Sequence, residues 1–381
     1  MGEDLLFKDV LVVNVDRAER ADVLVADGCI QQVSNSISSG ARKIDGRGKI
    51  LMPGFIDIHV HGANGFDVMD ADDLALSGMA QALPEEGVTA FVATTMTQTA
   101  DQIARAVETA GNYVGVGVSG EAELLGIHLE GPFLSREQAG AQNPEHFRKP
   151  DLALFKHWQA LSGGNIRIVT VAPELDGAEE FIQALIKSDV IASIGHSAAT
   201  YEQTIASKAQ HMTHLFNQMS AFHHREPGVV GAAMLDARFR VELIADLIHS
   251  HPAAVELAYQ QIGAGRLILI TDAMRAKGLG YGKYDLGGQA VVVDETGARI
   301  QNGRLAGSVL TMDRAIRNVQ ELCKCSLPEL VQMSSANAAT ALGLSKKDKI
   351  AAGMDADLVL LTEALEVELT VCRGEIAFSA N

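Results

Sequence analysis

The sequence predicts an α/β protein, a (β/α)8 TIM-like barrel with a small β-sandwich domain built from both chain ends. Three observations lead to this fold class. In the middle of the chain, apolar strand-like runs alternate with segments of helical period. Both chain ends are rich in short strands, and several central runs end in a histidine or a carboxylate. An open doubly wound sheet is the competing topology, but no G-x-G-x-x-G motif opens a helix in this chain.

The two chain ends predict one small domain made of residues 1–52 and 346–381. Short β-branched and apolar runs fill both segments, and Asp27-Gly28 between two of them is a type I′ hairpin signal. Neither segment is long enough to bury a core by itself. We therefore expect the two to pair into one β-sandwich, with residues 53–345 inserted between them as the barrel domain.

The central segment carries eight strand-like runs, and segments of helical period separate most of them. The expected strands are 55–60, 88–94, 124–129, 167–171, 190–194, 211–215, 241–245 and 267–270. The expected helices are 71–86, 100–110, 151–161, 177–187, 200–209 and 252–262. Eight strands that alternate with helical crossovers over roughly 200 residues are typical of a closed parallel barrel.

Composition restricts the class of partner. Of the 381 residues, 47% are hydrophobic, and the formal net charge is −17. This acidity argues against nucleic acid or an anionic membrane as a partner, because both favour a basic surface. No apolar run reaches membrane-spanning length, the first residues lack a signal-peptide pattern, and the four cysteines form no C-x-x-C pair. We therefore expect a cytoplasmic protein with reduced thiols.

His59 and His61 stand at the end of the first central strand. Residues i and i+2 of a strand point to the same side, so the two imidazoles aim at one point, where the chain turns at Gly62. Two neutral imidazoles that converge suit a first-row metal ion. A strand with two satisfied structural histidines has the same spacing, so the pair alone does not decide the question.

Four further strand ends carry groups of the same kind. The third run ends in Glu130, the fifth is followed by His196, the sixth contains His214, and the eighth is followed by Asp272. In a (β/α)8 barrel these ends meet at one rim, where the chemistry of the fold takes place. Ionisable groups are rarely buried unpaired, so four imidazoles and two carboxylates together predict a metal site.

A set of motifs resembles the amidohydrolase superfamily, and within it the family of N-acetylglucosamine-6-phosphate deacetylases. The similarity runs over essentially the whole chain, including both β-rich ends. The motifs are His59-x-His61, His128-Leu129-Glu130-Gly131-Pro132, Gly195-His196-Ser197, Thr213-His214-Leu215-Phe216-Asn217, His223-His224-Arg225-Glu226-Pro227-Gly228 and Thr271-Asp272-Ala273.

The resemblance implies a site with one or two divalent metal ions per subunit, of Zn, Fe, Co or Mn. Glu130, His196 and His214 match the ligands of one ion. His59 and His61 match a pair that holds a second ion in some members, with Glu130 as the bridge. Asp272 matches the residue that lies at the metal and serves as general base and acid.

The resemblance also implies a phosphorylated N-acetyl amino sugar as substrate and a homodimer in which Arg225 reaches the neighbouring site. The implied or expected substrate contacts are Gln142, Asn217, Gln218, Arg225, His249 and Ala306. Two positions depart from the family pattern. Gln142 stands where some members have a histidine, and Leu247 stands where the family usually has glycine, which puts the loop that carries His249 in doubt.

Three other functions remain open from the sequence. The galacto epimer of the substrate differs by the stereochemistry of one hydroxyl, which sequence reasoning does not resolve. A cyclic-amide hydrolase of the same superfamily would usually carry a carboxylated lysine on strand four, and residues 167–173 contain none. A non-catalytic scaffold would be expected to have lost ligands, and none is missing.

Overall fold

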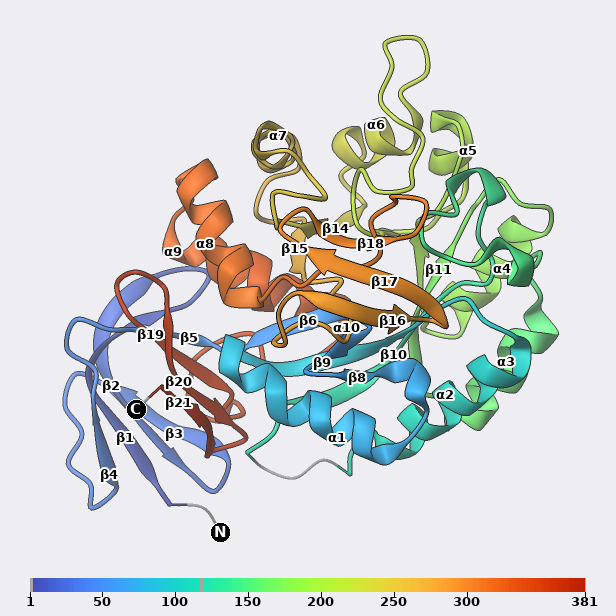
Figure 1. The fold of residues 1–381 in the computed structure, drawn as a ribbon. Coiled ribbons are helices and arrows are strands. Elements are labelled where there is room, and N and C mark those ends of the chain that lie inside the picture. Colours follow the sequence, from blue (N-terminus) through green and yellow to red (C-terminus); the bar gives the residue numbers. More distant parts are fainter. Residues whose placement is uncertain (1–2, 117–119, 381) are drawn as a thin grey trace.

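The computed structural model describes residues 3–116 and 120–380 (Figure 1). The strands of both chain ends lie together in one sheet, in the order β21-β20-β19-β5-β1-β2-β3, with β4 also paired to β1. This confirms the expected β-rich unit built from both ends. Its strands are β1 (Leu5–Val13), β2 (Ala18–Ala26), β3 (Cys29–Ser34), β4 (Arg42–Asp45), β5 (Ile50–Pro53), β19 (Leu358–Leu361), β20 (Val367–Cys372) and β21 (Glu375–Ser379).

Strand β5 joins the two chain ends and also faces the barrel. It pairs antiparallel with β19, with Met52 opposite Val359. Successive side chains of a strand point to opposite faces. Accordingly, Leu51 packs into the core of the small sheet, whereas Met52 and Val359 pack into the core of the barrel. The alternating pattern of β5 therefore fixes the small sheet onto the barrel.

Eight parallel strands form the barrel, in sequence order, as the sequence predicts. They are β6 (Phe55–Val60), β9 (Val88–Thr95), β10 (Glu123–Glu130), β11 (Ile166–Val171), β12 (Ile191–Ile194), β13 (His211–Met212), β14 (Arg240–Ile244) and β15 (Leu267–Ile270). The chain just after β15 returns to β6, where the Asp272 N–H donates to the His59 carbonyl at 2.8 Å. Strand β13 is shorter than expected, because the chain turns soon after Met212.

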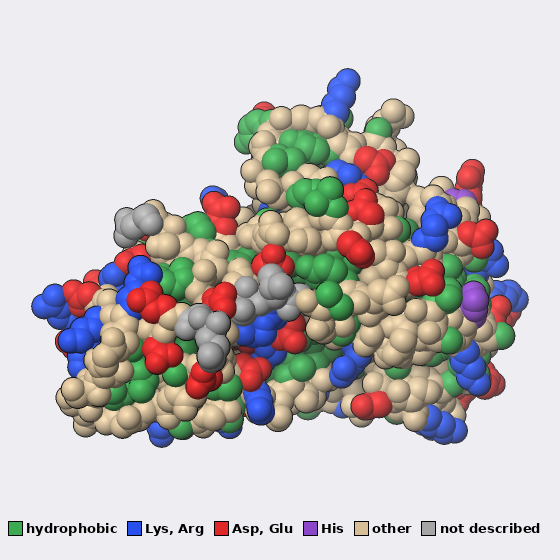
Figure 2. Space-filling view, turned by 90° about the horizontal axis from the view of Figure 1, so that it is seen from below, with side chains coloured by type: hydrophobic (Ala, Val, Ile, Leu, Met, Phe, Trp, Pro, Cys, Tyr) green, Lys and Arg blue, Asp and Glu red, His purple; other side chains and the backbone are tan. Residues whose placement is uncertain are grey.

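Helices surround the barrel (Figure 1). They are α1 (Asp73–Ala82), α2 (Ala100–Tyr113), α3 (Leu152–Leu161), α4 (Ala178–Lys187), α5 (Tyr201–Ala206), α6 (Gly228–Leu235), α7 (Pro252–Ile262), α8 (Met312–Cys323), α9 (Leu327–Val331) and α10 (Asn337–Leu342). Among the described residues, no helix combines the length and the apolar character needed to cross a membrane. Seen from below, acidic and basic side chains are interspersed over the surface (Figure 2).

Short elements complete the chain, and a small sheet covers the carboxyl ends of the barrel strands. The short elements are β7 (Gly62–Ala63), β8 (Phe66–Asp67), η1 (Val68–Asp70), η2 (Leu83–Glu86), η3 (Arg136–Gln138), η4 (Pro144–His146) and η5 (Gln332–Ala336). The covering sheet consists of β16 (Gly282–Leu286), β17 (Gln289–Asp294) and β18 (Gly297–Ile300). Its buried Val291 and Val293 pack with Met96 and Met274, which belong to the barrel side of the contact.

Candidate metal centre

Six ionisable side chains meet at the carboxyl end of the barrel, and each is at most 8% exposed. They are His59 in β6, His61 just after it, Glu130 at the end of β10, His196, His214 and Asp272. The Nε2 atoms of His214, His196 and His59 lie 2.9, 3.3 and 3.6 Å from Glu130 Oε1. His61 Nε2 lies 3.4 Å from Glu130 Oε2 and 3.1 Å from Asp272 Oδ1. The structure therefore brings all six predicted groups together.

The backbone turns sharply at three of these residues. His196, His214 and Asp272 each follow the last residue of a strand by two positions, with φ of 47°, 32° and 48°. This left-handed region is unfavourable for residues other than glycine, and such strain gathers at functional sites. Close packing beneath the site adds a constraint, because a Cβ at Gly195 would lie 2.7 Å from the Thr213 Cβ.

The outer nitrogen of three imidazoles is engaged by an acceptor. His61 Nδ1 lies 3.1 Å from the Thr94 carbonyl, and His196 Nδ1 lies 2.8 Å from the Gln138 carbonyl. His59 Nδ1 lies 2.9 Å from a carboxylate oxygen of Glu242. A carbonyl only accepts, so Nδ1 carries the proton, and Nε2 of the neutral ring presents its lone pair to the site.

This arrangement requires positive charge at its centre. In neutral histidines with the proton on Nδ1, the Nε2 lone pairs of His59 and His61 face the negative carboxylates of Glu130 and Asp272, which is repulsive unless a proton or a cation lies between them. His59 Nε2 is moreover buried with no hydrogen-bond partner among the described residues. Burial alone lowers the pKa of His61, but its hydrogen bonds with Asp272 and Glu130 outweigh burial and raise that pKa to about 9. Burial raises the pKa of Glu130, but the His59 charge outweighs it and holds that pKa well below its usual range.

A divalent metal ion meets the same need with the same lone pairs. Two groups that share Glu130 have ligand atoms within 4.8 Å of one another, namely Glu130 with His196 and His214, and Glu130 with His59 and His61. Imidazole and carboxylate donors that share one carboxylate are the ligand types of first-row metal sites. The residues present therefore fit one divalent ion or a pair.

Gln142 lies beside this cluster. Its Nε2 donates to Glu130 Oε2 at 2.7 Å, and its Oε1 accepts from the Thr97 N–H at 2.8 Å. The side-chain N–H of Gln142 is thus engaged with the carboxylate of Glu130, a residue of the candidate metal site. A contact from Gln142 to substrate stays a prediction.

A cavity of about 250 Å³ opens above the six groups. His61, Glu130 and Asp272 are among the residues that line it, together with Asn217 and Gln218 after β13. The Asn217 side-chain amide donates to the Leu215 carbonyl at 3.1 Å, which fixes its orientation. Two of the predicted substrate contacts therefore lie beside the candidate metal centre.

His249 also lines the cavity, although Leu247 occupies the position where glycine is expected. Leu247 adopts the left-handed conformation itself, with φ of 65°. Asp246 stabilises the turn, since its Oδ1 accepts from the N–H groups of Ile248 and His249 at 2.9 and 2.8 Å. The loop that the sequence left in doubt therefore forms with leucine in place.

Two predicted contacts are not among the residues that line the cavity. Arg225 is exposed on the loop between β13 and α6, which projects from the molecule (Figure 1), and its guanidinium lies 3.0 Å from His224 Nε2. Arg225 is not among the residues that line the cavity of its own chain. Ala306 is buried, and its N–H donates to the Ala298 carbonyl at 2.9 Å. That N–H is therefore not free for a sugar.

Comparison with known proteins identifies the family. A model described as "Amidohydrolase family" matches residues 50–377. The chain belongs to the amidohydrolase family. Among similar amidohydrolases, the N-acetylglucosamine-6-phosphate deacetylase of Lysinibacillus sphaericus is 48% identical, over 99% of this chain and 98% of that protein. The Bacillus subtilis (strain 168) deacetylase is 46% identical, again over 99% of this chain and 98% of that protein.

A solved structure supports the same relationship for this amidohydrolase. It is a mutant N-acetyl-D-glucosamine-6-phosphate deacetylase from Mycobacterium smegmatis, in complex with N-acetyl-D-glucosamine-6-phosphate. The two proteins are 33% identical and superpose with a TM-score of 0.92, covering 99% of this chain and 100% of that chain.

Three residues of this amidohydrolase site are absent from the sequence-based predictions. Glu242 accepts from His59, and its position inside the apolar run of β14 could have marked it as a buried carboxylate. Arg299 and Arg304 line the cavity from β18 and the turn after it. The presence of two arginines in or just after a glycine-rich segment of an acidic protein could have marked Arg299 and Arg304 as candidates for binding an anion.

Proposed function

We propose that this amidohydrolase removes the N-acetyl group of N-acetyl-D-glucosamine 6-phosphate by metal-dependent hydrolysis, which yields glucosamine 6-phosphate and acetate. This proposal rests mainly on the convergence of six side chains at the carboxyl end of the barrel, where all but His59 line one cavity. They are His59, His61, Glu130, His196, His214 and Asp272. Relatives that match over the full length carry this activity in their names. A cyclic-amide hydrolase has less support, since β11 holds no lysine.

Glu130, His196 and His214 would hold the first ion, and His59 and His61 would hold a second, with Glu130 between them. The donor set suits Zn, Fe, Co or Mn. A divalent ion held there lowers the pKa of water and polarises a carbonyl oxygen.

Asp272 moves the proton in this proposal. Its carboxylate takes a proton from the water whose oxygen attacks the acetyl carbon. It then gives that proton to the amide nitrogen as the C–N bond breaks, because an amine leaves readily only when its nitrogen is protonated. Asp272 Oδ1 lies 3.1 Å from His61 Nε2 and 3.5 Å from His59 Nε2, so its carboxylate borders the candidate metal centre.

Gln142, Asn217, Gln218 and His249 are proposed to position the phosphorylated sugar in the cavity of their own chain. We propose that Arg299 and Arg304 add positive charge at its rim, where a phosphate group would be attracted. Ala306 would contribute through packing beneath the cavity rather than through its N–H.

We further propose a homodimer in which Arg225 reaches the neighbouring site. Arg225 lies outside the cavity of its own chain, on a projecting loop. Beside it, Phe222 and Leu235 are 57% and 64% exposed, and with Leu257 they line an apolar hollow of about 480 Å³. An exposed apolar surface of this kind is typical of a protein interface.

The single sheet formed by both chain ends supports a proposal for the domain boundaries. Residues 1–52 with 346–381 form the small β-sandwich domain, and residues 53–345 form the barrel domain. A cytoplasmic location agrees with four cysteines that are unpaired in the structure.

A comparison of four substrates tests this function. It measures kcat/KM for N-acetylglucosamine 6-phosphate, its galacto epimer and the two unphosphorylated sugars. We expect the phosphorylated gluco sugar to exceed its unphosphorylated form by about 10- to 100-fold, the range of one or two charge-assisted hydrogen bonds. Equal values would contradict phosphate recognition, and a faster galacto epimer would replace the proposed substrate.

A further inference from the structure

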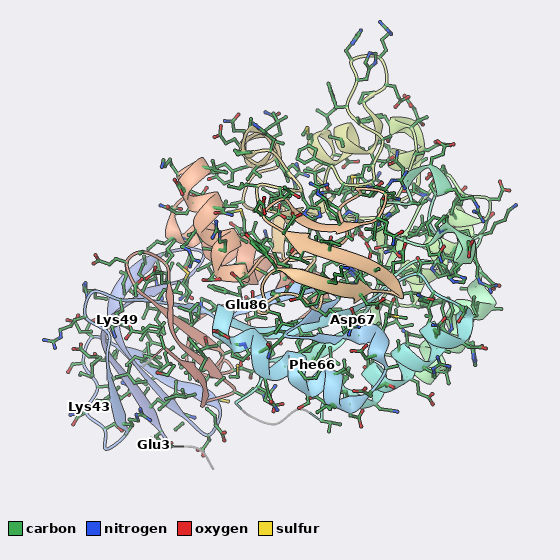
Figure 3. All side chains as sticks on the ribbon, viewed as in Figure 1. Glu3, Lys43, Lys49, Phe66, Asp67 and Glu86 are labelled. Atoms are coloured by element: carbon green, nitrogen blue, oxygen red, sulfur yellow. The ribbon has the colours of Figure 1, made fainter. Side chains whose placement is uncertain are left out.

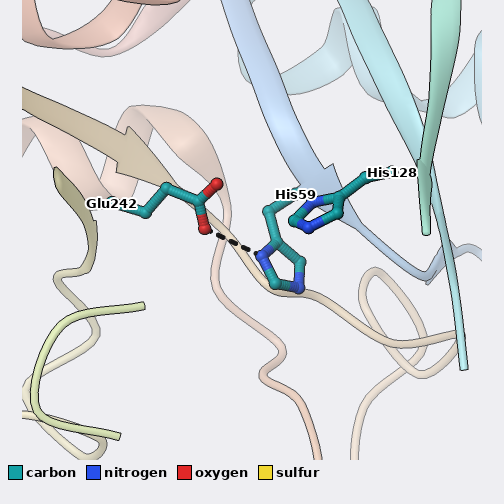
Figure 4. Close-up of side chains that lie close together, drawn as sticks. All are labelled: His59, His128 and Glu242. Carbon is teal, nitrogen blue, oxygen red and sulfur yellow. Dashed lines mark hydrogen bonds and ion pairs between the residues drawn. The ribbon is translucent and has the colours of Figure 1, made fainter. Parts of the chain in front are cut away.

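Glu242 belongs to barrel strand β14, and its carboxylate lies beside the ring of His59 (Figure 4). Its side chain is fully buried, and each carboxylate oxygen has a specific partner. Oε2 accepts from His59 Nδ1 at 2.9 Å, and Oε1 accepts from His211 Nε2 at 3.1 Å. The backbone N–H of His214 approaches Oε2 at 3.3 Å. His211 thus orients the carboxylate of Glu242, and that carboxylate in turn orients the ring of His59.

Glu242, His59 and His128 also come close enough to be a metal group of their own. Their hydrogen bonds argue against this. Both nitrogens of His128 have partners, since Nε2 lies 2.7 Å from Thr170 Oγ1 and Nδ1 lies 3.4 Å from the Ile58 carbonyl. The His128 ring packs edge-on against His59, with the ring centroids 4.6 Å apart. The group therefore orients a ligand rather than holding an ion.

The three candidate ligands with an engaged Nδ1 differ in what engages it. His61 and His196 donate to backbone carbonyls, whose positions their strands and turns fix. His59 donates to a side chain, and no other described group contacts its Nδ1. Among the described residues, Glu242 is therefore the hydrogen-bond partner that fixes the Nδ1 side of the His59 ring.

We infer that Glu242 is a positioning residue that fixes the tautomer and orientation of His59 and thereby sets the affinity of the His59–His61–Glu130 metal position. This inference rests on the proposed function, because it presumes an ion at that position. Within the Glu130–His196–His214 position, the one printed hydrogen bond to the Glu242 side chain among the described residues comes from the backbone N–H of His214, at 3.3 Å, and not from a ligand atom. The Glu130–His196–His214 position is therefore expected to depend on it far less.

Metal titration of the full-length protein tests the inference. We would measure Zn²⁺ affinity at both positions by competition with a chelator, and bound Zn²⁺ per chain after dialysis, for the wild type, Glu242→Gln and His59→Asn. Loss of an outer partner typically lowers metal affinity 10- to 100-fold. We expect Glu242→Gln to lose this affinity at the His59–His61–Glu130 position and to change the affinity of the Glu130–His196–His214 position by less than about threefold. His59→Asn should abolish binding at the His59–His61–Glu130 position.

Two further variants separate positioning from general stability. Glu86→Gln is the matched control, since Glu86 at the end of η2 is a buried carboxylate paired with Lys277 outside the site (Figure 3). It should lower the melting temperature and keep both metal affinities. Should Glu242→Gln fail to fold, His211→Asn loosens the same carboxylate without touching His59 and should weaken the same single position.

The outcomes distinguish the inference from the proposed function. A wild type that binds two ions, with a Glu242→Gln variant of unchanged affinity or weakened equally at both positions, would overturn the inference and leave the proposed function intact. A wild type that binds one ion would overturn the second metal position, and the inference with it.

Discussion

His249 illustrates how single residues carry this site. Burial lowers its pKa, but the hydrogen bond and the charge of Asp246, at 2.7 Å, outweigh burial and raise that pKa above 6.5. The same carboxylate holds the turn at Leu247, whose left-handed conformation costs about 1–2 kcal/mol. Asp246 therefore both favours the protonated form of His249 and keeps its loop in place beside the cavity.

Asp246→Asn should make stability less dependent on pH. The folded pKa of His249 is raised, so its stabilising contribution is fully present below pH 6.5 and is lost as pH rises through the folded value. The deficit of the variant in free energy of unfolding should be largest at low pH, at about 2 kcal/mol, and smaller above the folded pKa. Urea denaturation between pH 5.5 and 9 measures it. A deficit that is constant over this range would contradict the pairing.

Residues at strand ends were predictable from sequence, and residues elsewhere in the site were not. His59, Glu130 and Asp272 stand at or just beyond the ends of apolar runs, and the barrel collects those ends at one rim. Glu242 sits inside a run, where sequence alone does not reveal which face it points to. The engaged N–H of Ala306 depends on pairing across the covering sheet, which only the folded chain specifies.

At the scale of elements, the seam between β6 and β15 closes the barrel directly under the site. Asp57 of β6 is fully buried there. Its carboxylate accepts from Thr271 Oγ1 at 2.5 Å, from the Thr271 N–H at 3.3 Å and from the His59 N–H at 3.2 Å. The strand that carries His59 and the turn that carries Asp272 are therefore held together by one side chain.

Asp57→Ala should destabilise the protein by about 2–4 kcal/mol, because it leaves several buried donors without an acceptor. Urea denaturation of the metal-free protein provides the measurement. Asp101→Ala, at an exposed position in α2, should change stability by less than about 0.5 kcal/mol. Similar losses in the two variants would show that the seam does not depend on Asp57.

Most helices and strands of the barrel were predictable from the sequence, and the exceptions α6 and β13 each have a physical reason. The expected runs 55–60 and 267–270 coincide with β6 and β15, since buried parallel strands are continuous apolar runs with clear ends. Helix α6 was missed because Gly228–Leu235 is apolar on all sides and shows no helical period. Strand β13 ends at Met212, before the end of the expected run 211–215, because His214 adopts a left-handed conformation that extended strand geometry does not allow.

At the scale of the whole molecule, the proposed homodimer makes each site depend on two chains. Arg225→Ala homodimers would lack the arginine at both sites, and Asp272→Asn homodimers would lack the proton acceptor at both. In a mixed dimer, the site with an intact Asp272 would receive Arg225 from the other chain. Mixing the two inactive variants under conditions that exchange subunits should therefore restore up to about a quarter of wild-type kcat/KM, since half of the dimers are mixed and each has one complete site.

Absence of restored activity in mixed dimers would contradict the placement of Arg225 in the neighbouring site. Phe222→Asp provides the control, because a charge in the apolar hollow should yield monomers by light scattering and prevent the restoration.

The most direct test of the account is the activity and metal content of Asp272→Asn. If Asp272 moves the proton at a metal centre held by Glu130, His196 and His214, acetate release from N-acetylglucosamine 6-phosphate should fall by about 10²- to 10⁴-fold. The ion at that first position should remain bound. A variant that keeps its ion and hydrolyses the substrate within about threefold of the wild-type rate would contradict the central claim.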